Sequence, residues 1–280
     1  MTAADTLTGS SLRRREDARL LAGKGLYAGD VRPEGLCHAV FVRSPHAAAR
    51  IGRIDTQAAR AMPGVVAVFT AEDLARDGVT GMAAPVEMKR PDGAKAPVTP
   101  RPLRSQGRVR HLGEAVAMGV ATSQAAGIDA VERVSVDYDP LPAVTDARAA
   151  LAKGAPAVWD ETPDNVAFQW RHGDSDAVAK AIEGAAHVAR LDFVLTRVSA
   201  APMEPRVIVA APQPDGRVTV HASTQNPYQI RDGLAKLFNH PAGGIRVVAT
   251  DVGGSFGMKA GLSREDALVY WAAKRLGKPV

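Results

Sequence analysis

The sequence has a single cysteine, few aromatic residues and no long apolar run. Cys37 is the only cysteine among 280 residues, so an internal disulfide is excluded. One thiolate also cannot hold an iron–sulfur cluster, so any such cluster would have to belong to a partner. No stretch approaches the ~20 apolar residues that cross a bilayer. The charged run from Arg13 to Asp17 stands where a signal peptide needs apolar residues, and we therefore expect a cytoplasmic location with no membrane span.

Histidine spacing and charge exclude two further classes of function. The seven histidines are scattered, and no two have the i, i+4 spacing of a helical zinc site, so we predict no protein metal ligands. The net charge is +5, but Arg13 to Arg15 are followed at once by Glu16 and Asp17, and aromatic residues make up only 5%. Neither a long basic stripe nor a stacking platform is apparent. We expect no nucleic-acid partner, and interpret the basic surface as solvated or as a docking face for another subunit.

The first part of the chain alternates short strands and helices, which predicts an α+β fold. Hydrophobic residues make up 46% of the chain, enough to bury a core in one large or two ordinary domains. The runs that predict strands are 37–42, 51–54, 65–70, 116–121 and 131–138, and those that predict helices are 55–61 and 123–129. Residues 78–102 have no periodicity and predict an exposed excursion. The Asp139–Pro142 segment ends a first domain of residues 1–145, which we expect to fold as a unit.

A linker, residues 146–170, precedes a second set of elements in residues 171–280. Val178 and Ile182 predict a short helix, and residues 191–197, 207–211, 218–222 and 245–250 predict strands. Gly216 permits the positive φ of a hairpin turn between the second and third of these strands. Helices are expected from Asn226 as N-cap and, after a capping box that starts at Ser263, up to Gly277.

Two loops join a predicted strand to a predicted helix and could carry chemistry: Ser223–Pro227 and Gly253–Lys259. Such loops line the ligand crevice of α/β structures. Glycines let backbone N–H groups approach a ligand, although tight turns explain many such clusters. The amide of Gln225 can orient a ligand oxygen without adding charge, whereas Asn226 is better explained as a helix cap.

The pattern of Gly253, Ser255 and Gly257 also fits the G-x-S-x-G elbow of serine hydrolases. Two features argue against this alternative. A nucleophile elbow leads directly into a helix, whereas Lys259-Ala260-Gly261 intervenes here, and no histidine follows His240. A phosphate-binding P-loop is also excluded, because its G-x-x-x-x-G-K-S/T spacing is absent around Lys259. A hydrolase that uses Ser255 is our third choice of function.

The order of the segments resembles that of molybdenum hydroxylase large subunits, the family of xanthine dehydrogenase, aldehyde oxidase and carbon monoxide dehydrogenase. The segments that carry the resemblance in the first domain are Arg14–Tyr27, Val42–Ala47, Met62–Val65, Phe69–Leu74, Leu112–Ala117 and Val136–Pro142. The resemblance implies a hammerhead-like α/β domain over residues 1–145. It implies the first part of a molybdopterin-binding domain over residues 171–280, after the linker.

The same resemblance implies the site residues. Gln225 is similar to the glutamine that reaches the apical oxygen ligand of molybdenum. The cofactor-binding loop resembles G-G-x-F-G-x-K and consists here of Gly253, Gly254, Ser255, Phe256 and Gly257. Ser255 replaces a glycine common in the family, so it is tolerated only if its φ stays negative. Ala260 stands where some members have a substrate-binding glutamate, which argues against a purine substrate.

The implied function is a molybdenum-dependent oxidoreductase that hydroxylates an aldehyde, an N-heterocycle or a CO-type substrate with oxygen from water. Its cofactor would be molybdenum–molybdopterin, in the cytosine dinucleotide form, with [2Fe–2S] clusters and FAD on partner subunits. The general-base glutamate would lie in the remainder of the large subunit, so we expect the isolated chain to be inactive. The alternative is a catalytically incomplete assembly or interaction module of the same family.

Overall fold

Two antiparallel sheets form the first half of the protein. The computed structural model describes residues 9, 11, 13–79, 81–82, 88–97, 102–103, 105 and 107–280. One sheet has the order β1-β5-β3, with β1 (His38–Arg43), β5 (Ala115–Ala121) and β3 (Val65–Phe69). The other has the order β4-β2-β6, with β4 (Arg108–Val109), β2 (Ala49–Asp55) and β6 (Ser135–Pro140). Every residue of β5 is buried, as its apolar sequence and its central position require.

Short helices connect these strands: α2 (Gln57–Arg60), α3 (Ala71–Arg76) and α4 (Gln124–Val131). The predicted strand 131–138 instead begins at Ser135, because α4 extends to Val131 and turn hydrogen bonds continue to Val134. The predicted excursion 78–102 lies partly outside the described residues. In its described part, Lys89 and Lys95 form an antiparallel bridge.

The second half contains a mixed sheet of order β7-β8-β9, with β7 (Ile208–Pro212), β8 (Val218–Ala222) and β9 (Ile245–Val248). The predicted hairpin between β7 and β8 is confirmed, and Gly216 has a φ of 84° in its turn. Strands β8 and β9 are parallel. They are joined by α7 (Pro227–Leu237) and the 3-10 helix η3 (Ala242–Gly244), while α8 (Arg264–Leu276) packs against β7.

Capping side chains begin α7 and α8, and a glycine ends α8, where the sequence predicts. The Asn226 side chain accepts a hydrogen bond from Gln229 N (3.1 Å), and Pro227 occupies the first turn of α7. Ser263 and Asp266 form a capping box at the start of α8, and Gly277 ends this helix with a φ of 62°. Both helices therefore begin at residues fixed by local chemistry.

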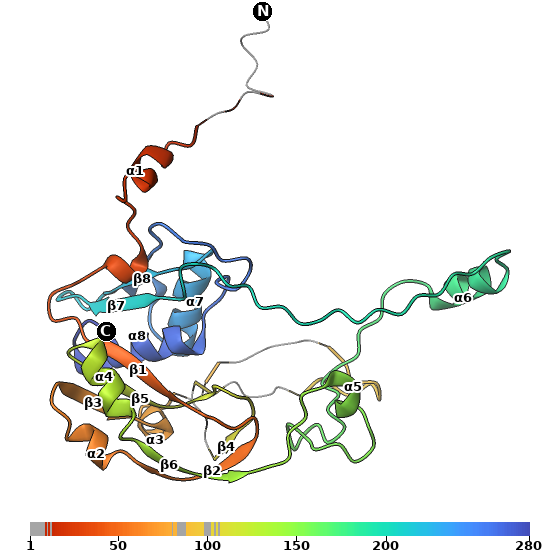
Figure 1. Cartoon of the computed structure of the whole chain (residues 1–280), viewed down its shortest axis with the longest axis horizontal. Helices are drawn as coiled ribbons and strands as arrows, with labels where there is room; N and C mark the ends of the chain where they lie inside the picture. The colour runs from red at the N-terminus through yellow and green to blue at the C-terminus, as the bar shows by residue number, and fades with distance from the viewer. Residues whose placement is uncertain are drawn as a thin grey trace, which may run out of the picture.

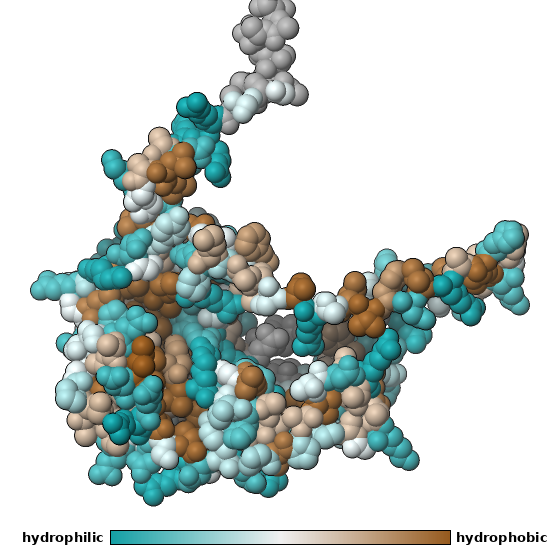
Figure 2. Space-filling view, viewed as in Figure 1, coloured by the Kyte–Doolittle hydropathy of each residue, from teal (hydrophilic) through white to brown (hydrophobic). Residues whose placement is uncertain are grey.

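The predicted strand 191–197 is wrong. This segment has no strand hydrogen bonds and belongs to an extended arm that leads away from α6 (Ser175–Glu183) in Figure 1. Its apolar side chains face solvent, with Leu195 92% exposed, and appear as brown patches along the arm in Figure 2. A strand needs a neighbour for its backbone N–H and C=O groups, and none lies beside this arm in the described part of the chain.

The N-terminal segment is fastened to the second half of the protein. It contains α1 (Asp17–Leu21) and the 3-10 helix η2 (Ala28–Asp30). The Arg19 guanidinium binds both carboxylate oxygens of Asp251, and Leu26 N donates to the same carboxylate (2.8 Å). The hydrogen bond from Arg19 lowers the pKa of Asp251 to about 2. No helix in the described ranges is long and apolar enough to span a bilayer.

One apolar core joins the two halves of the protein. Phe69 of β3 meets the Trp271 ring of α8 edge to face, with centroids 4.8 Å apart. The Trp271 indole N–H donates to Asp77 Oδ2 (2.9 Å), and Arg275 binds the same carboxylate. The linker, which contains α5 (Ala147–Ala150), also packs on the first half, since Arg110 stacks on Trp159 at 3.9 Å. The boundaries at residues 145 and 170 stay predictions.

We expect Trp271→Ala to lower the free energy of unfolding by about 3–5 kcal/mol, because it leaves a cavity at the junction of the two halves. The measurement is urea denaturation followed by circular dichroism. Trp271→Phe is the matched control: it keeps an aromatic ring against Phe69 and loses the hydrogen bond to Asp77. A loss no larger for alanine than for phenylalanine would contradict a shared core that depends on this ring.

Candidate functional site

The two loops singled out in the sequence lie side by side. Strands β8 and β9 are parallel neighbours, so the chain leaves both at the same edge of the sheet. The Ser223–Asn226 loop leads into α7, and the Gly253–Lys259 loop leads towards α8. Gln225 N and Thr224 Oγ1 each donate to the carbonyl oxygen of Lys259, at 3.0 Å. These two hydrogen bonds hold the loops together.

A chain of hydrogen bonds orients the Gln225 side chain. Lys259 N donates to Ser255 Oγ (3.0 Å), and Ser255 Oγ lies 2.6 Å from Gln225 Oε1. The hydroxyl accepts from the backbone and donates its own hydrogen to the amide oxygen. The Gln225 side chain is exposed, and its Nε2 group remains available to donate to an oxygen atom outside the protein.

Three of the five predicted residues of the glycine loop have a positive φ angle. Gly254, Phe256 and Gly257 have φ values of 95°, 52° and 86°. Ser255 keeps a negative φ, as expected for a serine that replaces a glycine, and the rare left-handed conformation falls on Phe256 instead. The Phe256 side chain is 77% exposed.

Different structural requirements explain the glycines at positions 253 and 257 of this loop. A Cβ atom on Gly253 would lie 2.5 Å from Glu204 Cβ, so this position is fixed by packing within the protein. A Cβ on Gly257 would meet no atom within 4 Å, so the space beside its backbone is open to a ligand. Here the reason for glycine is the positive φ, which other residues rarely adopt.

Glu204 and Lys259 form a buried ion pair that the sequence did not reveal. The Lys259 side chain is 1% exposed, and its Nζ lies 3.1 Å from Glu204 Oε2, 2.9 Å from Glu204 O and 2.6 Å from Ser223 Oγ. Glu204 Oε2 also accepts from Ser223 Oγ and Gly253 N, both at 2.7 Å. This cluster ties the segment before β7 to both loops.

The ionised form of Glu204 is favoured in this cluster. Burial raises the pKa of the Glu204 carboxyl, but hydrogen bonds from Ser223, Gly253 N and Lys259 outweigh burial and lower the pKa overall. One sequence signal did exist: a lysine in an apolar, glycine-rich loop is seldom buried without a counter-charge. With 30 acidic residues in the chain, the sequence could not say which one supplies it.

The hydrogen bonds of Ser255 give it no general base. Its hydroxyl contacts the Gln225 amide oxygen and a backbone N–H, and neither group can remove a proton at neutral pH. Lys259, the nearest cationic side chain in sequence, directs its ammonium to Glu204 and Ser223 instead. The geometry therefore supports a positioning role for Ser255, and no nucleophilic one.

Known families match both halves of the chain. Residues 22–142 match the aldehyde oxidase and xanthine dehydrogenase a/b hammerhead domain, and residues 158–280 match the molybdopterin cofactor-binding domain. The chain belongs to the family of molybdenum hydroxylase large subunits. The α+β fold, with a hammerhead domain followed by part of a molybdopterin-binding domain, is thereby confirmed.

Relatives from this family resemble the chain over nearly its whole length. The large subunit of nicotine 6-hydroxylase from Paenarthrobacter nicotinovorans is 37% identical, over 97% of this chain and 32% of the relative. The carbon monoxide dehydrogenase large chain of Afipia carboxidovorans is 32% identical, over 99% of this chain and 35% of the relative. The crystal structure of quinoline 2-oxidoreductase from Pseudomonas putida 86 superimposes with a TM-score of 0.88 at 38% identity, over 97% of this chain and 34% of that one. The chain thus spans about a third of the length of these family members.

We expect Lys259→Met to lower the free energy of unfolding by about 3–5 kcal/mol, because it leaves Glu204 buried without its counter-charge. Glu204→Gln should also destabilise the protein. The double variant should lose less than the sum of the two single losses, since the partners interact directly. Chemical denaturation of the four proteins measures this coupling, and strictly additive losses would show that the pair is not the link between the loops.

The acid dependence of stability provides a control for the same pair. A carboxyl whose pKa is lowered by folding stabilises the protein above its ordinary pKa, and this contribution is lost as the pH falls through the lowered value. Glu204→Gln should therefore flatten the decline of stability at acid pH, relative to the unchanged protein.

Proposed function

We propose that Gln225 and the loop Gly253, Gly254, Ser255, Phe256 and Gly257 form one wall of a molybdenum–molybdopterin site. The observation that carries this proposal is the hydrogen bonding of Gln225: its amide oxygen accepts from Ser255, and the side chain is exposed, with no partner for its amide N–H group among the described residues. Such a neutral donor fits an oxygen ligand of the metal. The open backbone beside Gly257 fits the close approach of a flat cofactor.

The bound cofactor would supply two-electron oxidation of the substrate carbon. In this arrangement the residues of the chain itself hold the cofactor and orient the groups that contact it. Gln225 donates a hydrogen bond to the cofactor side of the site, Ser255 keeps the amide from turning over, and the pair of Glu204 and Lys259 fixes the loops on which both residues stand. Restricting a side chain to one hydrogen-bonding direction is worth more in a site that excludes water than on an open surface.

The proposed reaction is hydroxylation of an aldehyde, an N-heterocycle or a CO-type substrate, with electrons passed to [2Fe–2S] clusters and FAD on partner subunits. Two observations support partner clusters: Cys37 is the only cysteine and is buried, and several relatives are named as large subunits or as a subunit of a complex. The cytosine dinucleotide form of the cofactor, the remainder of the large subunit as a partner and a cytoplasmic location belong to the same proposal.

We expect the 280-residue chain alone neither to retain molybdenum nor to oxidise aldehydes, because Gln225 and Phe256 are exposed and form only one wall of a site. Both abilities should appear when the other two thirds of a related large subunit and its partner subunits are co-expressed. Elemental analysis and dye reduction with an aldehyde measure the two properties. Stoichiometric molybdenum and turnover in the isolated chain would contradict the proposed open wall, and metal without turnover in the complete complex would favour an assembly module.

In the completed complex we expect Gln225→Ala to lower kcat by about 10- to 100-fold, because a preorganised hydrogen bond is lost. Ser255→Ala should lower kcat in the same direction by a smaller factor, since Gln225 remains but its amide can turn over. Steady-state kinetics and thermal unfolding are measured together. Gln229→Ala, an exposed position on α7, is the matched control and should change neither. Unchanged kcat for Gln225→Ala would remove this residue from the site.

A further inference from the structure

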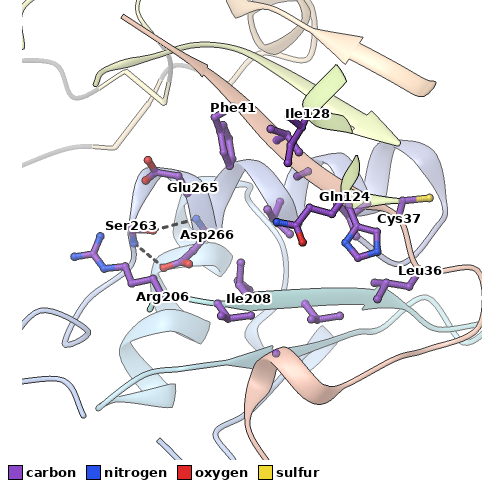
Figure 3. Close-up of a pocket in the computed structure, with 18 of the residues that line it drawn as sticks. Leu36, Cys37, Phe41, Gln124, Ile128, Arg206, Ile208, Ser263, Glu265 and Asp266 are labelled. Atoms are coloured by element: carbon purple, nitrogen blue, oxygen red, sulfur yellow. Dashed lines mark hydrogen bonds between the residues drawn. The ribbon is translucent and has the colours of Figure 1, made fainter. Parts of the chain in front are cut away.

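The two halves of the protein share one core, but a gap lies between the outer strands of their sheets. β1 is the outer strand of the sheet β1-β5-β3, and β7 is the outer strand of the sheet β7-β8-β9. A cavity of about 750 Å³ lies between these strands and is also lined by residues of α4 and α8. Figure 3 shows β1 and β7 on opposite sides of this space, with α8 behind it.

Pro279 and Val280 occupy one end of the gap and bond to both of its edges. Val280 N donates to Ala210 O (3.0 Å), and Ala210 N donates to Val280 O (2.9 Å). On the other side, Cys37 N donates to Pro279 O (2.8 Å). A pair of residues that exchanges both backbone hydrogen bonds is the unit of an antiparallel ladder. Val280 therefore lies as the first residue of a strand antiparallel to β7.

The unused hydrogen-bonding groups of β7 point into the gap. Backbone groups of successive residues face opposite edges of a strand. Val207 O accepts from Ser223 N, on the side of β8, whereas Ala210 faces Val280. Val209 therefore faces β8, and Ile208, two residues before Ala210, presents its N–H and C=O groups to the gap.

The same alternation applies to β1, which runs in the opposite direction to β7. Cys37 lies beside Pro279 at one end of the gap. At the other end, Arg43 pairs with Glu265 at 2.9 Å, and Glu265 lines the cavity together with Arg206, as Figure 3 shows. Because Cys37 N faces the gap, the N–H groups of Ala39 and Phe41 face it as well, while Val40 faces β5.

We propose that this gap is the slot for one added β-strand that starts at Val280 and lies antiparallel to β7 and parallel to β1. The added strand would join the two sheets into one, of order β3-β5-β1-added-β7-β8-β9. The added strand would come from the remainder of a large subunit. The identity of this source, unlike the gap itself, rests on the proposed function. The family members compared above are about three times as long as this chain, which supports such a source.

The surroundings set the chemistry of the strand. Val280 is buried in the same core as Val269 of α8, so residues that follow Val280 at intervals of two would meet α8. The alternate residues would meet the side of α4, where Ile128 is 42% exposed. Both faces of the strand would be covered, which requires apolar side chains throughout. The gap extends from Ala210 to Arg206, where charged groups gather, so the slot accepts about five residues before a polar end.

The test appends the sequence Ile-Val-Val-Val-Thr to Val280 and follows amide hydrogen exchange by NMR. The N–H groups of Ile208, Ala39 and Phe41 should exchange at least tenfold more slowly in the extended chain. Those of Val209 and Val40 already bond within their sheets and should not change. A matched extension with proline at its second position, opposite Ile208, should fail to protect Ile208, because proline breaks the ladder there.

Two results would overturn the proposal. Equal exchange at Ile208, Ala39 and Phe41 with and without the extension would show that the gap accepts no strand. Protection that rises with the concentration of the unextended chain would show that a second copy fills the gap, for which the exposed segment 191–197 is available. Neither measurement involves molybdenum, so failure here is distinguishable from failure of the proposed cofactor site.

Discussion

The buried ion pair between Lys259 and Glu204 is the constraint on which the candidate site depends. Removing two charges from water is costly unless both are well paired and hydrogen-bonded. Here Glu204 Oε2 also accepts hydrogen bonds from Ser223 Oγ and Gly253 N, so this oxygen and the Lys259 ammonium are satisfied only when three separate segments meet. Glu204 Oε1 is buried without a hydrogen-bond partner among the described residues, which leaves part of the cost of burial uncompensated. The positions of both loops follow from this requirement.

This constraint explains how an exposed side chain can be held in one orientation. Gln225 is exposed, and an exposed amide without a hydrogen-bond partner in the protein can rotate. Its orientation comes from Ser255, whose hydroxyl is held by the backbone of Lys259. The side chain of Lys259 is anchored to Glu204, so the buried ion pair fixes the Lys259 backbone that holds Ser255. Through Ser255 it thereby also fixes the exposed amide of Gln225. Ser255 thus has a structural role, which is to hold the Gln225 amide.

Residues 191–197 and the outer edges of β1 and β7 lack strand neighbours for one physical reason. Residues 191–197 have the composition of a strand but have no neighbour, and β1 and β7 have neighbours on one edge only. Strand formation requires a partner for each backbone group, unlike helix formation, in which the segment supplies its own hydrogen bonds. Apolar composition can therefore favour a strand, as at residues 191–197, where the described part of the chain offers no neighbour and no strand forms.

The sequence by itself determined the features that depend on near neighbours. These are the caps at Asn226 and Ser263, the hairpin turn at Gly216, the central strand β5 and the two loops between strand and helix, together with the family resemblance. Only the tertiary structure decided which acid pairs with Lys259, that Ser255 holds Gln225, and that β1 and β7 face each other across a gap. Capping and turn preferences act over a few residues, whereas these contacts join residues far apart in the chain, and no local pattern encodes such a choice.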